Sequence, residues 1–318
     1  DERGRQEVID KLEHKNFCLL DGLCVSAPSS VMSAITMITG KPAYNQYPNY
    51  MKIDFRKTHH KTITKSLSQN GVNIYGIFYY REMRELLRSE YPAIKNEYLI
   101  SNSANLEERW SNEFIYRQVH HLFKNNLLKQ PYHLMLWFNS RDDYKTSYYV
   151  EKTINCLEKT NNWDKTLVLV TGDHGYPDMR RGFTSDGADL KKVGLRHDLI
   201  MTDDNLIVPL AIKYGDVKLN SFFEKGIYKQ ELIHNLTEHF YYKKTDRDLK
   251  KVFEKNHINQ NNYYIGDSRF FLQKNRKTTI RSDVRKIIFY PDKSCELYDL
   301  HQDPLEEKSH KVNLDDID

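Results

Sequence analysis

Apolar residues along the chain follow two spacings, which predict alternating strands and helices. Short apolar runs predict strands at residues 17–20, 72–78, 133–138, 165–171 and 206–213, with further strands in 263–300. Apolar residues at helical spacing predict helices at 30–39, 58–69, 79–89, 106–127, 144–160 and 228–242. This alternation is typical of an α/β fold with a mostly parallel central sheet and helices on both faces.

The pattern also predicts a division of the chain. Residues 243–262 are rich in Lys and Asn and predict a linker, after which strand patterns return. We therefore expect a catalytic domain at 1–245 and a small C-terminal antiparallel α+β subdomain at 246–318. A chain of 318 residues is long enough to bury a large core.

One predicted strand leads directly into candidate chemistry. The apolar run Thr166–Val170 is followed by Asp173, His174 and Gly175. Open α/β sheets bind ligands at the carboxyl ends of their strands, and Gly relieves the backbone there. A carboxylate beside an imidazole at such an edge indicates a metal site. A tight turn in which Asp caps the next helix explains the same residues.

A second segment near the amino terminus reads as a loop followed by a helix. Ser and Pro in residues 26–30 give way to an apolar stripe at helical spacing, and Gly40 ends it. A Ser at the start of that helix lies in its partial positive charge, where an anionic ester is favoured. Ser29 or Ser30 is alternatively a simple N-cap, and both roles are compatible in one pair.

Together these segments resemble the alkaline phosphatase/sulfatase superfamily. The family nucleophile stands ten residues before the Gly that ends its helix, which corresponds here to Ser30. Ala27-Pro28-Ser29 and Ser33 match neighbouring motif positions, whereas Met32 replaces the usual Pro. The resemblance implies that Ser30 is both nucleophile and metal ligand, and that Asp173 and His174 are metal ligands.

Two further stretches extend the resemblance. Residues 194–212 resemble the family segment in which a His precedes a Val-Pro-Leu-Ile strand, which implies site roles for Arg196 and His197. The segment from Glu296 to Glu307, with Leu-Tyr-Asp-Leu and Asp-Pro-Leu-Glu, is close to the sulfatase ending. That ending implies a terminal sheet packed on the core and carries no catalytic residue.

Two departures from the family affect the expected metal site. The family takes a ligand from an Asp on its first strand; Asp1 is the candidate here, with an ordinary terminal residue as the alternative. Two-metal members carry a further Asp and His, but no His follows Asp142, so Asn139, Asp142 and Asp143 offer only oxygen. One divalent ion is expected, Mg²⁺, Ca²⁺ or Mn²⁺ in preference to Zn²⁺.

These residues predict ester transfer through a covalent seryl intermediate at Ser30. The sulfatase motif needs Arg at its end, which Ser26–Ser30 lacks, so the chain is expected to act on a phosphoester, as hydrolase or transferase. A cell-envelope glycan is the substrate class that the resemblance implies. The alternatives are a sulfuric ester hydrolase and a non-catalytic binding module. The basic side chains near the motifs are candidate partners for the substrate charge: His59, His60, Arg180, Arg181, Lys191, Lys192 and Arg196.

Composition limits the partners. The net charge of +4 is mild and the basic residues are interspersed with acids, so nucleic acid is not expected. The four cysteines have no Cys-x-x-Cys spacing, which indicates reduced thiols. No apolar run is long enough to cross a bilayer and no signal peptide is present, so a cytoplasmic location is expected. The sequence leaves the oligomeric state open.

Overall fold

The computed structural model describes residue 12 and the ranges 15–42, 61–78, 112–138, 143–176, 200–242, 244–268 and 276–313. The chain divides into two compact units. The first comprises Asp1–Leu19, Asp54–Val168 and Ala211–Lys218, and the second comprises Leu20–Ile53, Leu169–Leu210 and Leu219–Asp318. The division falls inside three strands, which therefore each contribute residues to both units. The predicted domain boundary at residue 245 stays a prediction.

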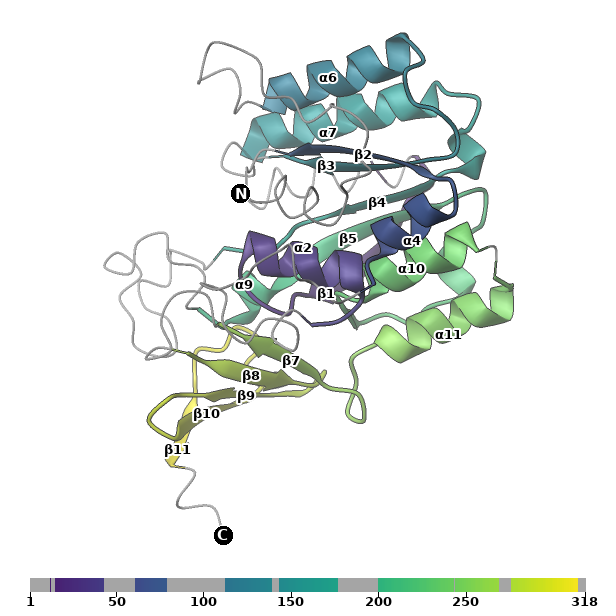
Figure 1. The fold of residues 1–318 in the computed structure, drawn as a ribbon. Helices are drawn as coiled ribbons and strands as arrows, with labels where there is room; N and C mark the ends of the chain where they lie inside the picture. The colour runs from purple at the N-terminus through teal and green to yellow at the C-terminus, as the bar shows by residue number, and fades with distance from the viewer. Residues whose placement is uncertain are drawn as a thin grey trace. The chain divides into compact units, whose positions relative to one another are not determined.

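The first unit contains a parallel pair of strands. Strand β2 (Asn73–Phe78) pairs with β3 (Tyr132–Trp137), and helix α4 (Ile63–Gln69) precedes β2 and packs on it. Helix α6 (Asn112–Lys124) packs on β2 and on helix α7 (Asp143–Glu158), as Figure 1 shows. Apolar residues at helical spacing on α6 form the buried core with the strand: Ile77, Ile115, Val119 and Leu122.

The second unit contains most of a four-stranded sheet with the order β4-β5-β1-β6, of which β1, β4 and β5 also have residues in the first unit. Its strands are β1 (Cys18–Cys24), β4 (Leu167–Thr171), β5 (Ile207–Tyr214) and β6 (Ile227–Lys229). Strand β1 is parallel to β6, with Gly22 opposite Ile227. Helix α2 (Ser30–Thr39) packs against α10 (Leu232–Tyr241), which also packs against α11 (Asp246–Asn256).

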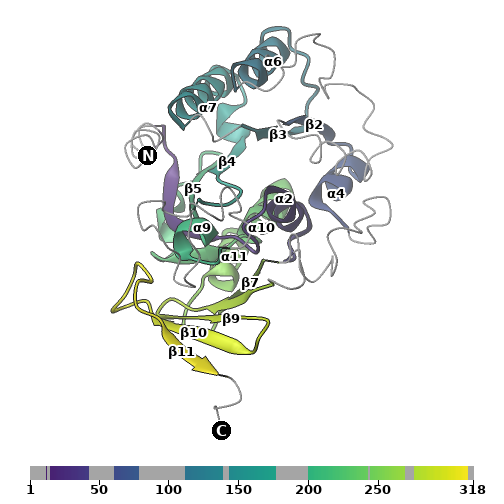
Figure 2. The same ribbon diagram turned by 90° about the vertical axis from the view of Figure 1, so that its left-hand side faces the viewer.

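The same unit holds a separate antiparallel sheet, which the yellow-green ribbons in Figure 2 show. Its order is β11-β10-β9-β8-β7. The strands are β7 (Tyr264–Asp267), β8 (Thr278–Arg281), β9 (Arg285–Phe289), β10 (Ser294–Asp299) and β11 (His310–Asn313). The predicted α/β fold with a small antiparallel C-terminal sheet is therefore confirmed.

Most predicted elements agree with the structure to within a few residues. Strand β1 is longer than the predicted 17–20, and the predicted helix at 79–89 lies outside the described residues. The linker prediction for 243–262 was wrong, because α11 occupies most of it. Thr245 caps that helix by accepting a hydrogen bond from Asp248 N, and Leu249 and Phe253 bury one face.

The short 3₁₀ helices Trp163–Lys165 and Leu219–Ser221 and the four-residue helix α9 (Asp203–Leu206) complete the described elements. All four cysteines carry free thiols, in agreement with the sequence. Within the described ranges, no helix combines the length and apolar character that crossing a membrane would require.

Candidate active site

Ser30 is the first residue of helix α2. Ser29 before it has the extended backbone of an N-cap residue but makes no side-chain cap bond, so the first amide groups of the helix are not satisfied by that hydroxyl. Val31, Ala34, Ile35 and Ile38 are buried and hold the helix on the core, while Ser30 is half-buried. The side chain of Ser30 thus lies at the positive end of a ten-residue helix.

His174 meets Ser30 after strand β4 ends. The Ser30 hydroxyl oxygen lies 3.3 Å from His174 Nε2, although the two residues are 144 positions apart in the chain. Asp173 Oδ2 lies 3.6 Å from the same nitrogen. The His174 side chain is only 4% exposed and that of Asp173 is 18% exposed. The structure therefore brings together Ser30, Asp173 and His174, as the sequence predicts.

Hydrogen bonding orients the His174 ring. Nδ1 lies 2.7 Å from the carbonyl oxygen of Gly175, and a carbonyl can only accept, so Nδ1 carries the proton. In the neutral ring Nε2 then keeps a lone pair that points towards Ser30. That nitrogen is available either as a metal ligand or as the acceptor of the Ser30 hydroxyl proton.

Backbone contacts fix the corner formed by Asp173, His174 and Gly175. The hydroxyl of Ser33 on helix α2 donates to the carbonyl oxygen of Asp173. Gly175 N donates to Asn205 O at 2.9 Å. A Cβ atom at Gly175 would lie 2.0 Å from Asp204 O, so only Gly permits this close approach of two backbones.

The loop before Ser30 is equally constrained. Ser26 is fully buried, with its hydroxyl 2.6 Å from that of Thr36 and its amide donating to Gln230 Oε1 at 3.3 Å. Asp267 N donates to Ser26 O at 2.9 Å. A buried Ser26 with a partnered hydroxyl is unsuited to act as a nucleophile, which leaves Ser30 as the candidate.

Several predicted site residues lie outside the described ranges. They include Asp1, Arg196 and His197, the candidate cations from His59 to Lys192, and Asn139 and Asp142. Asp143 begins helix α7, but its side chain is not described. Within the described ranges, no group of three or more His, Cys, Asp or Glu side chains could hold a metal. The metal-ligand role of Asp1 stays a prediction.

The donor atoms that are described fit a divalent ion. Ligands about 2.1 Å from a tetrahedral metal lie about 3.4 Å apart, as do octahedral ligands about 2.4 Å from Ca²⁺. The spacings of 3.3 Å from His174 Nε2 to Ser30 Oγ and 3.6 Å to Asp173 Oδ2 match that value. These two spacings are compatible with one divalent ion and do not distinguish between metals.

Sequence reasoning missed the segment that supports the corner. Helix α9 begins at Asp203 and provides the Asn205 carbonyl that accepts from Gly175 N. Thr202 followed by two Asp residues is an N-terminal helix signal that could have located α9. Nothing in the local sequence indicates that its carbonyl groups reach the site.

Similar proteins were found by structure and not by sequence. No protein-family model and no curated protein matches the chain in sequence. The structure is similar to BT1596, a 2-O GAG sulfatase, with a TM-score of 0.66 and 12% identity over 92% of this chain and 80% of that one. It is also similar to lipoteichoic acid synthase LtaP from Listeria monocytogenes, with a TM-score of 0.53 and 12% identity over 97% and 81% of the two chains.

A protein in the alkaline phosphatase superfamily from Vibrio parahaemolyticus is similar as well. Its TM-score is 0.51 at 12% identity, over 93% of this chain and 70% of that one. At this identity the likeness concerns the fold. The chain has the fold of the alkaline phosphatase/sulfatase superfamily, as the sequence motifs predict.

Proposed function

We propose that the protein is a metal-dependent phosphoester hydrolase or phosphotransferase of the sulfatase-like class, with Ser30 as its nucleophile. The observation that carries the proposal is the 3.3 Å approach of Ser30 Oγ to His174 Nε2 at the start of helix α2, with Asp173 Oδ2 at 3.6 Å from that nitrogen. A hydroxyl, an imidazole and a carboxylate from distant segments converge there in a partly shielded corner.

Asp173, His174 and Ser30 would hold one divalent ion, Ca²⁺, Mn²⁺ or Mg²⁺ by the sequence argument, and Asp1 is the candidate for a further ligand. A bound ion lowers the pKa of a coordinated hydroxyl and polarises an ester oxygen. The Gly175 carbonyl holds His174 in the tautomer that presents the Nε2 lone pair. Arg196 and His197 are proposed to neutralise the substrate charge.

In the proposed reaction, Ser30 Oγ gives its proton to solvent water and attacks phosphorus, and the bond from phosphorus to the leaving alcohol oxygen breaks. The amino end of helix α2 stabilises the developing negative charge. A proton returns to the leaving alkoxide. Water or an acceptor alcohol then attacks the seryl phosphoester and releases Ser30, which distinguishes hydrolase from transferase.

We infer a glycan or glycan-linked phosphoester as the substrate class. Two proteins of similar structure are a 2-O GAG sulfatase and lipoteichoic acid synthase LtaP. Phosphoester chemistry is favoured over sulfate ester hydrolysis by an ordinary Ser at the nucleophile position and by the lack of the sulfatase Arg at the end of Ser26–Ser30.

The test is an assay of the full chain on nitrophenyl phosphate, bis-nitrophenyl phosphate and nitrophenyl sulfate, with Ca²⁺, Mn²⁺, Mg²⁺ or Zn²⁺ and with chelator. We expect metal-dependent turnover of a phosphoester that Ser30→Ala lowers by at least about 1,000-fold. Ser29→Ala is the matched control, because its neighbouring hydroxyl makes no cap bond, and it should keep turnover within a few-fold.

Turnover that survives Ser30→Ala would remove the nucleophile assignment. Turnover of the sulfate ester alone would establish the sulfatase alternative. Tight binding of a glycan without turnover of any ester, in protein with a bound divalent ion, would establish the binding-module alternative.

A further inference from the structure

Helix α9 is bonded to both segments that form the candidate active site. Asn205 O accepts a hydrogen bond from Gly175 N at 2.9 Å, next to His174. Leu206 O accepts one from Val25 N at 2.8 Å, in the loop between β1 and Ser30. The relative placement of Ser30 and His174 therefore depends on where these four residues lie.

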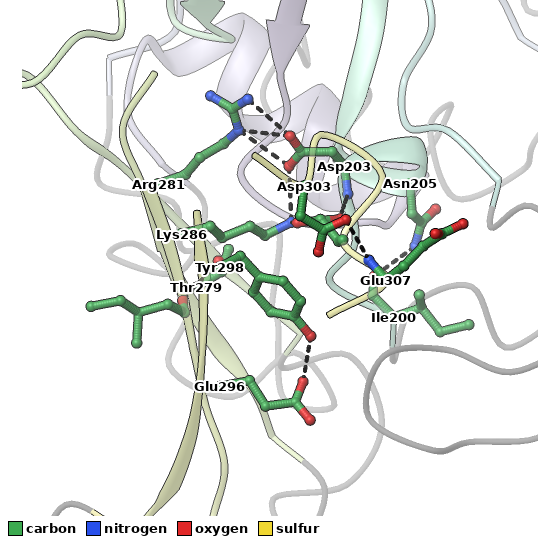
Figure 3. Close-up of polar contacts among 12 residues, drawn as sticks. Ile200, Asp203, Asn205, Thr279, Arg281, Lys286, Glu296, Tyr298, Asp303 and Glu307 are labelled. Atoms are coloured by element: carbon green, nitrogen blue, oxygen red, sulfur yellow. Dashed lines mark hydrogen bonds and ion pairs between the residues drawn. The ribbon is translucent and has the colours of Figure 1, made fainter. Parts of the chain in front are cut away.

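Buried charges hold the first residue of α9. Arg281 on β8 binds the Asp203 carboxylate through Nε, at 3.1 and 2.9 Å from its two oxygens, and through Nη2 at 2.8 Å. Lys286 Nζ on β9 lies 2.9 Å from Asp203 Oδ1, and its side chain is fully buried. Figure 3 shows both cations reaching Asp203 from the antiparallel sheet.

Glu306 completes this group, which we call the charge cluster: Asp203, Arg281, Lys286 and Glu306. Glu306 Oε2 accepts from Asp203 N at 2.7 Å, and Glu306 Oε1 lies 2.5 Å from Lys286 Nζ. Thr202 makes no side-chain cap bond to α9, so Glu306 supplies the cap from a distant segment. The cluster contains two cations and two carboxyl groups.

The backbone of Glu306 is held in an unusual conformation. Its φ is +56°, in the left-handed region, which costs an L-residue roughly 1 kcal/mol or more. The conformation directs a side chain that is 1% exposed towards Lys286 and α9. Gly or Asn would adopt this backbone conformation with less strain. Only the longer Glu side chain carries the carboxyl group that contacts Lys286 and Asp203 N.

The two carboxyl groups of the cluster differ: burial raises the pKa of Glu306 to about 7, against the opposing effect of the Lys286 charge. Burial alone raises the pKa of Asp203, but the adjacent Lys286 and Arg281 charges lower it to about 2. Asp203 is therefore a carboxylate at neutral pH and keeps both cations bound. Removing one member would leave an uncompensated buried charge, which is far more costly than losing the whole set.

We propose that Glu306, Lys286 and Arg281 are positioning residues of the candidate active site, which act through α9 to hold Gly175 and Val25 in register. The antiparallel sheet, which the sequence assigns to the fold alone, would thereby set the distance between Ser30 and His174. The term active site rests on the proposed function, whereas the mechanical link does not.

Amide hydrogen exchange at Gly175 and Val25 tests the link directly. In Glu306→Ala the cap on Asp203 N is lost, and we expect both amides to exchange at least about tenfold faster because α9 shifts or frays. Glu306→Gln keeps an acceptor for Asp203 N without the charge and should restore much of the protection. If Glu306→Ala proves too unstable to study, Glu306→Gln provides a folded variant that lacks the charge.

Tyr298→Phe is the matched control. Tyr298 Oη donates to the buried Glu296 at 2.7 Å in the same sheet. Its loss should weaken the sheet and leave Gly175 and Val25 protected. The Kd for Ca²⁺ should rise about tenfold in Glu306→Ala and stay unchanged in Tyr298→Phe.

Unchanged exchange at both amides in Glu306→Ala, or equal acceleration in Tyr298→Phe, would overturn the positioning role. A chain that neither binds Ca²⁺ nor turns over an ester would refute the proposed function. Accelerated exchange confined to the charge-cluster variants would still support the link in that case, so the two failures are distinguishable.

Discussion

At Gly175 the backbone of the chain comes into close contact with the backbone of Asp204. Gly175→Ala would place a Cβ 2.0 Å from Asp204 O, and a backbone carbonyl cannot move aside as a side chain can. We expect a loss of roughly 2–4 kcal/mol in the free energy of unfolding, measured with urea. The same change should also weaken Ca²⁺ binding, because His174 is the preceding residue.

Gly71→Ala is the control for this prediction. Gly71 has a φ of +83°, but no atom lies within 4 Å of a Cβ built there. Its substitution should cost only about 1 kcal/mol, the penalty of the left-handed backbone. Equal costs at the two glycines would mean that the corner can yield and is not a rigid part of the site.

Glu231 makes stability depend on pH. Burial raises the pKa of its carboxyl from 4.5 to about 7, against the opposing effects of its own backbone hydrogen bond and of Lys229 and Lys255. A raised carboxyl pKa means that the folded state binds the proton more tightly. Its stabilisation is complete below pH 4.5 and is lost as the pH rises to about 7.

The expected loss has a ceiling of roughly 3 kcal/mol, which solvent screening reduces because the residue is only half-buried. Glu231→Gln should remove this part of the slope when unfolding free energies are compared between pH 4.5 and 8. A variant whose slope matches the parent would show that the carboxylate is accommodated without cost.

At the residue scale, the sequence predicts the three residues at the centre of the site but not the residues that support them. Ser30, Asp173 and His174 stand in local motifs that can be read without a structure. The charge cluster cannot be predicted this way, because Asp203 and Lys286 are 83 positions apart and neither has a distinctive neighbourhood. A buried ion pair is specified by tertiary packing, which single-residue patterns do not contain.

Helix α11 is the element that the sequence assigns wrongly. Only two of its eleven residues, Leu249 and Phe253, are large buried apolar side chains, so the polar composition predicts a linker. The stabilising features are local hydrogen bonds at Thr245 and packing against α10 and β6. The predicted helix at 228–242 overlaps strand β6. Three residues form a strand only through pairing with β1, which the local sequence does not indicate.

The cap of α11 is open to a direct test. Thr245 Oγ1 accepts from Asp248 N at 3.3 Å and donates to Asp248 Oδ2 at 2.7 Å. Thr245→Ala should lower the free energy of unfolding by about 1 kcal/mol, measured with urea. Thr245→Ser keeps the hydroxyl and should remain within about 0.5 kcal/mol of the parent. A larger loss in Ser than in Ala would exclude the cap as the cause.

At the scale of the whole molecule, the fold was predictable because strands and helices alternate and the motifs stand in family order. The boundary between compact units was not, since it cuts through β1, β4 and β5. Strand patterns report burial along one segment, and they carry no information on which part of a strand belongs to which cluster of contacts.

Binding of a divalent ion to the folded chain should raise its melting temperature. An ion present at about 100 times its Kd stabilises by about 2.7 kcal/mol, or roughly 5 °C for a chain of this size. We expect a shift with the ions that the sequence favours, Ca²⁺, Mn²⁺ or Mg²⁺. Asp173→Asn is expected to abolish most of the shift.

Equal shifts in the parent and in Asp173→Asn would place the ion elsewhere. The shifts are read from melting curves in which chelator-treated protein serves as the reference.

The mutual contacts of Asp203, Arg281, Lys286 and Glu306 also constrain how this protein can diverge over evolutionary time. Replacement of any one of them leaves a buried charge without its partner, whereas replacement of all four by well-packed apolar side chains is tolerable. Substitutions at these four positions should therefore occur together. Related proteins are expected either to retain the whole charge cluster or to lack all four residues.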